Sequence, residues 1–278
     1  MQPLLRLTVL VDRLAVRPDL ETEHGLAVLV EVGDAVLLFD AGASGAAFRN
    51  AERLGLPWRR ISRIVLSHGH RDHSGGLAPF LEALPRAEVY LHTGALVPRF
   101  SLHPGRPCRA LGMPEEVQAG LLARRDQLRW ATAPMRLGPG LGLTGPVPRR
   151  HREEAHSGPF FLDVEGRRPD PLGDDLALWI ATPRGTVILM GCAHAGVRNT
   201  LEHVQALAGG GPVRAVVGGL HLAAASPARL EATLAGMRRA GVRLVAPFHC
   251  TGAPAQEAIR EAWGAEGRPL LAGERLDL

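Results

Sequence analysis

The segment "SHGHRDHSGG", residues 67–76, gathers three histidines and one aspartate within six consecutive positions: His68, His70, Asp72 and His73. A short apolar run precedes it, so His68 and His70 extend a strand and face the same side, where both imidazoles can bind one ion. Asp72 and His73 then open a helix and can bind a second ion nearby. Imidazole and carboxylate suit zinc, iron or manganese, whereas the chain has too few thiolates for a closed structural zinc site. The segment therefore predicts much of a two-metal site rather than a solvated turn.

Short apolar runs separated by turn residues indicate the elements that position this motif. In the first part of the chain we expect strands at residues 4–12, 26–32, 35–42, 63–68 and 87–92, and helices at 45–55 and 75–85. Later we expect a hairpin of strands 174–182 and 185–191, helices at 195–207, 227–241 and 254–264, and strands at 213–219 and 242–249. This order predicts a layered α/β protein whose sheets are covered by helices.

Residues 98–158 differ from their surroundings, because they are rich in Arg, Pro and Gly and show little periodicity. We interpret them as an insertion of loops and short helices that forms a lid or a specificity region. No linker divides the chain, so we expect a single domain over residues 1–278.

All 32 basic residues are arginine, and the net charge is +4 with a pI near 9.7. The arginines are scattered among acidic residues and prolines, so a nucleic-acid partner is disfavoured despite the basic pI. Without lysine, Schiff-base chemistry and a phosphate-loop lysine are excluded.

Three widely spaced cysteines make a poor disulfide framework and favour a reducing, cytoplasmic setting. The N-terminus has the pattern of a first strand rather than of a signal peptide, and no apolar run is long enough for a membrane span. A homodimer is compatible with these features.

The motif "HGHRDHSGG" resembles the HxHxDH signature of the metallo-β-lactamase superfamily, and "LLFDAG", which contains Asp40, resembles the superfamily's first motif. The resemblance extends along most of the chain to one subgroup, the 7,8-dihydropterin-6-methyl-4-(β-D-ribofuranosyl)aminobenzene-5'-phosphate synthases. The further matching pieces are "EHGLAVLVE", "PVPRR", "DDLALW", "MGCAHAGVRNT", "VVGGLHL" and "FHCTG". The resemblance implies the four-layered αββα sandwich of the superfamily, in agreement with the layered α/β prediction.

The resemblance also implies a ligand set for two divalent ions, most commonly zinc, with manganese or iron as alternatives. His68 and His70 would bind the first ion together with His194 of "GCAH". Asp72 and His73 would bind the second, and His249 lies where the superfamily has its last histidine ligand.

Cys192 departs from the superfamily pattern, because many members have a bridging aspartate at the end of the corresponding strand. Cys192 could lie near the metals as a thiolate, a water could form the bridge alone, or one metal could be held loosely. A small buried residue at a strand end is the alternative without function, since cysteine is often buried.

The roles of several further residues can be interpreted in two ways. His221 is either a core histidine at a strand end or a substrate-facing acid or phosphate binder, and we favour the second interpretation. The same argument applies to His24. Arg149, with His221, would stabilise developing oxyanion charge. Asp40 fits a residue that orients a ligand histidine better than a ligand.

Three other side chains have weaker claims to a function. Asp174 and Asp175 have the pattern of a turn, with a paired-carboxylate role as the alternative. His156 is either a ligand in a different register or part of a solvated loop.

The predicted activity is that of a dinuclear metal-dependent hydrolase that uses metal-bound hydroxide on a phosphoester or related small, anionic substrate, with Asp72 and His221 as catalytic residues. The first alternative is a dihydropterin-transferring synthase that acts on a pterin diphosphate. A nucleic-acid-processing metallohydrolase and a non-enzymatic metal or redox protein are further alternatives.

Overall fold

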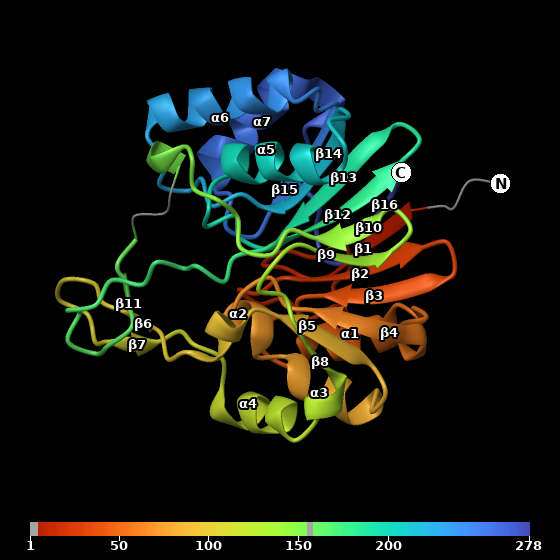
Figure 1. The fold of residues 1–278 in the computed structure, drawn as a ribbon, viewed down its shortest axis with the longest axis vertical. Helices are drawn as coiled ribbons and strands as arrows, with labels where there is room; N and C mark the ends of the chain where they lie inside the picture. Colours follow the sequence, from red (N-terminus) through yellow and green to blue (C-terminus); the bar gives the residue numbers. More distant parts are fainter. Residues whose placement is uncertain (1–4, 155–157) are drawn as a thin grey trace. The chain divides into compact units, whose positions relative to one another are not determined.

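The computed structural model describes residues 5–154 and 158–278, and the chain divides into two compact units (Figure 1). Unit 1 contains residues 1–130, 158–171 and 271–278, and unit 2 contains residues 131–157 and 172–270. Each unit is built around its own sheet. The single domain expected over residues 1–278 stays a prediction.

Unit 1 holds a seven-stranded sheet with the order β16-β1-β2-β3-β4-β5-β8. Its strands are β1 (Leu5–Val11), β2 (Ala27–Val32), β3 (Ala35–Phe39), β4 (Ile61–Val65), β5 (Glu88–Leu91), β8 (Leu128–Trp130) and β16 (Arg275–Asp277). The strands from β16 to β3 pair antiparallel, and those from β3 to β8 pair parallel. The parallel part directs the ends of β3 and β4 to one edge of the sheet, so the residues that follow these two strands lie close together.

Helices α1 (Ala46–Arg53), α3 (Leu77–Ala83) and α4 (Glu115–Leu122) pack on one face of this sheet, where Leu38 and Ile64 belong to a shared core with Phe80. The ring of Phe48 meets that of Phe80 edge to face, with centroids 5.1 Å apart. The same unit contains the short helix α2 (Arg71–Ser74) and the 3-10 turns η1 (Trp58–Arg60), η2 (Thr93–Leu96) and η3 (Arg125–Gln127).

A small three-stranded sheet, with the order β11-β6-β7, also belongs to unit 1. Its strands are β6 (Phe100–Ser101), β7 (Arg109–Ala110) and β11 (Phe160–Phe161). Next to it the Nε of Arg99 donates to the Oδ2 of Asp170 at 2.7 Å, and both side chains are only 2% exposed. This buried ion pair ties the segment before β6 to the segment after β11.

Unit 2 holds a six-stranded sheet with the order β15-β14-β13-β12-β10-β9. Its strands are β9 (Met135–Gly138), β10 (Leu141–Leu143), β12 (Ala177–Thr182), β13 (Gly185–Met190), β14 (Val213–Gly219) and β15 (Leu244–Phe248). Strands β12 and β13 form the expected hairpin, and β13, β14 and β15 run parallel.

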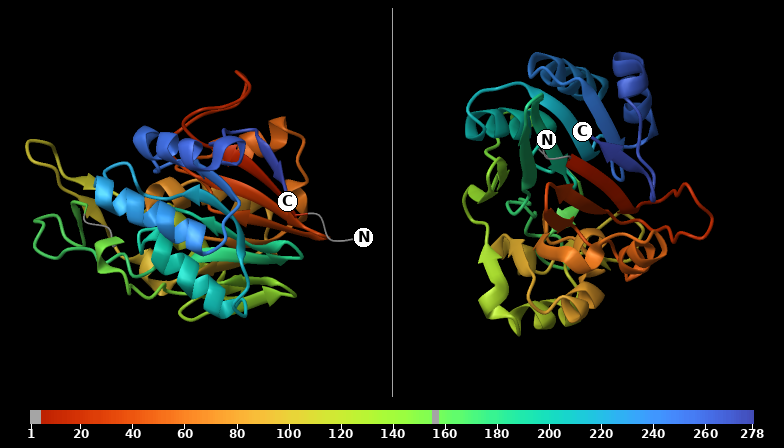
Figure 2. Two further views of the ribbon diagram at one scale, coloured as in Figure 1. Left: turned by 90° about the horizontal axis from the view of Figure 1, so that it is seen from above. Right: turned by 90° about the vertical axis from the view of Figure 1, so that its right-hand side faces the viewer.

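Helices α5 (Val197–Leu207), α6 (Pro227–Arg239) and α7 (Ala253–Trp263) cover one face of β13, β14 and β15 (Figures 1 and 2). Val204, Met237 and Ile259, one from each helix, are buried in one core with Ile188 and Val216 of the sheet. The remaining short turns of this unit are η4 (Arg152–Glu154) and η5 (Gly264–Glu266).

The expected strands and helices are present, and the α/β class is confirmed. Strands β8, β9 and β10 lie within or next to the stretch expected to be irregular, and β16 near the C-terminus was not predicted. These strands are three or four residues long, so their local pattern is weak and their place depends on the neighbouring strand. The proposed role of residues 98–158 as a lid stays a prediction. Among the described residues, no helix has the length and apolarity that a membrane span requires.

Candidate metal centre

The histidine motif lies where β4 leaves the sheet of unit 1 and leads into α2. His68 and His73 are fully buried and His70 is 5% exposed. The ring of His68 lies 4.6 Å from that of His70 and 4.2 Å from that of His73, measured between centroids. The motif thus brings three imidazoles together inside the protein, an arrangement that costs free energy unless the rings are hydrogen-bonded or bind a cation.

Asp40, directly after β3, fixes two members of this motif. Its carboxylate accepts hydrogen bonds from the backbone N–H and the hydroxyl of Ser67, both at 2.7 Å, and from Nδ1 of His73 at 2.7 Å. Because a carboxylate only accepts, His73 carries a proton on Nδ1, and in the neutral ring this leaves the lone pair on Nε2. Metal-binding histidines have this arrangement. The contacts are those that the predicted orienting role of Asp40 requires.

Glycines allow the motif to pack closely. A Cβ on Gly69 would lie 2.2 Å from the carbonyl oxygen of Ala95, and a Cβ on Gly76 would lie 2.0 Å from that of Ser44. Side chains cannot be accommodated at such distances without backbone shifts. The glycines between and after the histidines are therefore required by packing and keep the three rings in place.

Asp72 is a quarter exposed and belongs to a hydrogen-bonded chain at the surface of unit 1. The Nε2 of His24 lies 3.3 Å from Oδ2 of Asp72, and Nε of Arg13 donates to Nδ1 of His24 at 3.0 Å. His24 therefore contacts a predicted ligand directly. Its predicted part in substrate binding stays a prediction, and the contact adds a role in orienting Asp72.

In unit 2 the predicted residues follow the ends of three adjacent parallel strands. Cys192 and His194 follow β13, His221 follows β14 and His249 follows β15. The Nδ1 of His221 lies 3.5 Å from Sγ of Cys192, and the His221 ring centroid lies 4.6 Å from that of His194. The structure thus brings Cys192, His194 and His221 together, as the carboxyl ends of parallel strands permit.

The backbone at these strand ends has an unusual conformation. Ala193, His221 and His249 in unit 2, and Asp40 in unit 1, adopt positive φ values of 49°, 48°, 56° and 56°. Non-glycine residues avoid this region, and such strain concentrates at functional sites. Four of the five positive-φ non-glycine residues among the described ones are therefore candidate site residues or neighbours of one in the chain.

Cys250 was not predicted to belong to the site. Its Sγ lies 3.0 Å from Sγ of Cys192, and Cys192, His221 and Cys250 form a cluster whose potential ligand atoms lie within 4.8 Å of one another. Burial opposes ionisation of Cys250, but hydrogen bonds with Cys192 and His221 and the nearby imidazoles outweigh it and lower the pKa of this thiol well below its ordinary value. The only local signal was the piece "FHCTG" after a strand, which parallels "MGCAH".

Asp175 is another buried residue whose importance the sequence did not reveal. Its Oδ2 accepts a hydrogen bond from the backbone N–H of Ala195 at 2.9 Å, so it holds the loop that carries His194. Burial and the neighbouring charge of Asp174 raise the pKa of Asp175 to about 7, against the hydrogen bonds from the loop. Arg149 donates to the carbonyl oxygen of Leu172 at 2.8 Å. Its predicted contact with substrate stays a prediction.

The remaining histidines divide between structural contacts and the undescribed segment. His156 lies outside the described residues. His151 bonds to Glu202 and Arg198, and Nε2 of His203 lies 3.0 Å from the carbonyl oxygen of Thr144. These contacts give His151 and His203 structural hydrogen-bond partners.

The donor set fits divalent metals in both units. Unit 1 offers three clustered imidazoles and one carboxylate, and unit 2 offers imidazoles beside two thiol groups. Imidazole with carboxylate or thiolate is the ligand chemistry of zinc, and imidazole with carboxylate also suits iron and manganese.

The sequence of this chain is similar to those of known proteins. The sequence profile of the metallo-beta-lactamase superfamily matches residues 21–234. An uncharacterized protein of Methanocaldococcus jannaschii is 30% identical over 246 residues, which are 88% of this chain and 90% of that protein. The 7,8-dihydropterin-6-methyl-4-(beta-D-ribofuranosyl)-aminobenzene-5'-phosphate synthase of the same organism is 27% identical over 272 residues, 91% of this chain and 89% of the enzyme.

Among solved structures, Tm1679, described as a metal-dependent hydrolase of the beta-lactamase superfamily, has a TM-score of 0.82 and 29% sequence identity. The match covers 99% of both chains. The predicted metallo-β-lactamase fold is confirmed by these similarities.

Proposed function

Because the chain belongs to the metallo-β-lactamase superfamily, we propose that it is a dinuclear metal-dependent hydrolase that acts on a small, anionic phosphoester or a related substrate. The observation that carries the proposal is the buried histidine cluster of unit 1, in which Asp40 fixes the tautomer of His73. A cytoplasmic location is part of the proposal.

We assign the ligands as the superfamily resemblance implies. His68, His70, Asp72 and His73 would come from unit 1, and His194 and His249 from unit 2, with Cys192 as a further group near the metals. The ions would be zinc, with manganese or iron as alternatives. Two divalent cations would supply Lewis acidity and lower the pKa of a water molecule.

Other side chains of the protein would then position the attacking water and the substrate. Asp72 would be held by His24 and orient the attacking water. His221, whose Nδ1 faces Cys192, would present its other ring nitrogen to the substrate and, with Arg149, stabilise developing negative charge. These assignments make Asp72 and His221 the catalytic residues, and His24, Arg149 and His221 the residues nearest the substrate.

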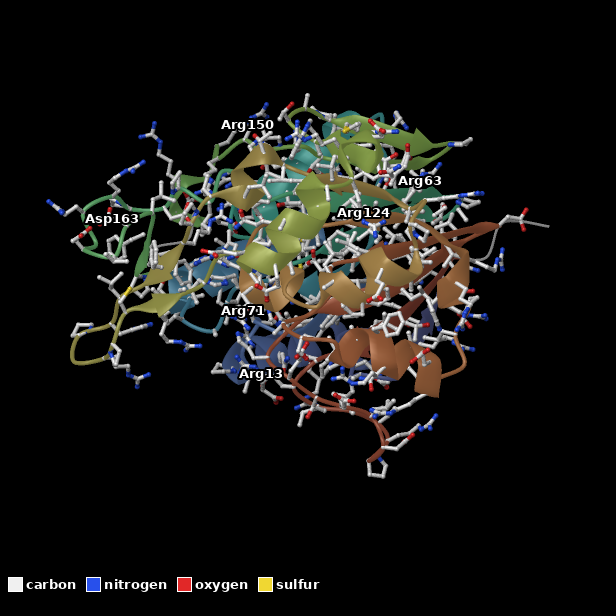
Figure 3. All side chains as sticks on the ribbon, turned by 90° about the horizontal axis from the view of Figure 1, so that it is seen from below. Arg13, Arg63, Arg71, Arg124, Arg150 and Asp163 are labelled. Carbon is white, nitrogen blue, oxygen red and sulfur yellow. The ribbon has the colours of Figure 1, made fainter. Side chains whose placement is uncertain are left out.

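A second candidate is transfer of a dihydropterin group from a pterin diphosphate. The similarity to the dihydropterin synthase over 91% of this chain favours it. The same residues would hold the metals, which would supply the positive charge that binds the diphosphate leaving group while an aromatic amine attacks the pterin methylene carbon. A nucleic-acid substrate has less support, since the arginines are scattered along the sequence; on unit 1 the partly exposed Arg124 lies apart from the exposed Arg13 and Arg71 (Figure 3).

Metal analysis and a substrate screen test the proposal. We expect about two metal ions per chain and metal-dependent turnover in a panel of phosphodiesters, lactones and pterin diphosphate with an aromatic amine. His70→Ala should lose metal and activity while it stays folded, whereas the matched variant His203→Ala should keep both. Turnover of only pterin diphosphate with the amine would favour the transferase. A protein with neither bound metal nor metal-dependent turnover of the panel would contradict both candidates.

A further inference from the structure

Two thiol groups from strands that are not neighbours meet at the edge of the unit 2 sheet. Cys192 follows β13 and Cys250 follows β15, and β14 lies between these strands. In the register, Met190 pairs with Gly218 and Phe248 pairs with Gly219, so each cysteine lies two residues beyond a paired position. Their Sγ atoms nevertheless lie 3.0 Å apart. The strand ends must turn toward each other across the end of β14.

The end of β14 is built to allow this approach. A Cβ on Gly219 would lie 2.8 Å from Sγ of Cys250 and 2.2 Å from the carbonyl oxygen of Gly191. A Cβ on Gly218 would lie 1.9 Å from the carbonyl oxygen of Met190. Any side chain at these two positions would push the flanking strand ends or the thiol aside. The glycine pair therefore leaves room for the two thiols to meet.

The surroundings differ for the two sulfur atoms. Cys192 is 4% exposed, whereas Cys250 is partly exposed, so Cys250 is the more accessible residue of the pair. The third cysteine of the chain, Cys108, is exposed and belongs to unit 1. The chain thus contains one close pair of thiols in unit 2 and a third thiol in unit 1, whose oxidation reports general oxidation.

We propose that Cys192 and Cys250 are a redox-active pair that forms an intramolecular disulfide with a peroxide as oxidant. Sγ of Cys250 attacks the peroxide O–O bond, which gives a sulfenic acid and one water when the oxidant is hydrogen peroxide. Sγ of Cys192 then attacks the sulfenic sulfur, the S–S bond forms and the second water leaves. The two thiols lose two protons and two electrons, and a small-molecule thiol reverses the reaction by exchange.

Formation of the disulfide requires only a small movement of the two sulfur atoms. A disulfide needs an S–S distance of about 2.05 Å, so the sulfur atoms must approach by about 1 Å from their present separation. The proposal goes beyond the proposed function and does not depend on it, because a disulfide can be detected whether or not the protein turns over any substrate.

The test uses the full-length protein with and without a chelator. Hydrogen peroxide is added, the protein is denatured, and the remaining thiols are counted. We expect the count to fall from three to one, with Cys108 remaining. Because the chain has no lysine, trypsin should release Cys192 on residues 185–198 and Cys250 on residues 244–260. Mass spectrometry should show these two peptides linked, with a loss of two hydrogens that dithiothreitol reverses.

Cys108→Ser is the matched control and should form the same link, whereas Cys250→Ser should not. A link that forms only after chelation would also support the pair and would show that metal protects Cys192. Three remaining thiols under both conditions would overturn the proposal. So would sulfinic acids without a link, or a disulfide between chains through Cys108.

Discussion

Replacement of Asp40 by Asn tests how the histidine motif is set up to bind metal. Oδ1 of Asp40 accepts the backbone N–H of Ser67, and Oδ2 accepts the hydroxyl of Ser67 and Nδ1–H of His73. In Asp40→Asn the amide oxygen must stay at the Oδ1 position, because the backbone N–H of Ser67 can only donate. The amide NH2 then faces His73. To avoid two opposed donors, His73 must move its proton from Nδ1 to Nε2, where it blocks the lone pair that a metal needs.

The expected loss follows from this tautomer change. Removal of a partner that orients a ligand histidine typically weakens metal binding about 10- to 100-fold. The corresponding loss of binding free energy is about 1.4–2.8 kcal/mol. Loss of the charge-assisted hydrogen bond should also lower the free energy of unfolding by about 1.5–3 kcal/mol.

Competition with a chromophoric zinc chelator measures the affinity, and denaturant unfolding of the metal-free protein measures stability. Glu154→Gln is the matched control, since Glu154 is a fully buried carboxylate that accepts from the backbone N–H of Arg198 at 2.6 Å and from the hydroxyl of Thr233 at 2.7 Å. Neither of these two donors is a predicted metal ligand. It should lose similar stability and keep its metal affinity. If Asp40→Asn binds zinc within about threefold of the natural chain, a change of less than about 0.7 kcal/mol, the tautomer explanation is wrong.

Three further variants test other parts of the structure. Gly69→Ala should lower the midpoint of thermal unfolding strongly, since the added Cβ would lie 2.2 Å from a carbonyl oxygen. Gly211→Ala is the control and should change the midpoint little, because no atom lies within 4 Å of its added Cβ. Equal midpoints for the two variants would refute the packing explanation. Asp170→Ala should lower the free energy of unfolding by about 3–5 kcal/mol, because it leaves the buried guanidinium of Arg99 without its carboxylate. A loss below about 1 kcal/mol, which is typical of a surface ion pair, would contradict this prediction. The Arg49 guanidinium lowers the pKa of Glu21 from 4.5 to about 2 despite partial desolvation, so this carboxylate stabilises the fold above pH 4.5 and the contribution is lost as the pH falls toward 2. Glu21→Gln should therefore flatten the decline of unfolding free energy between pH 4.5 and 2, and an unchanged decline would show that Glu21 has no part in it.

The sequence predicted the long strands and helices and the position of the histidine motif after β4, because these depend on local periodicity. Asp40, Cys192, His221 and His249 could be located because each follows a recognisable strand. A side chain at the end of a parallel strand lies near its neighbours in the sheet whatever the details of the loops, so these predictions needed only the order of the elements.

Other features depend on contacts between distant residues and gave little local signal. The approach of Cys250 to Cys192 requires the register of β13, β14 and β15 and the missing Cβ of Gly219. The burial of Asp175 depends on the loop after β13, which is about 20 residues away in the chain. A residue with the sequence pattern of a turn is therefore a buried support for the loop that carries His194.

The left-handed conformation of Asp40, Ala193, His221 and His249 also has a consequence for how the chain can evolve. Each such residue costs about 1–2 kcal/mol relative to an ordinary backbone conformation, and a folded domain has only about 5–15 kcal/mol of stability in total. The strained backbone at these strand ends thus lowers the free energy of unfolding. Less stability is then left to offset destabilising substitutions elsewhere in the chain. Lineages of this chain should tolerate fewer destabilising changes in their cores than a fold of the same size with relaxed strand ends.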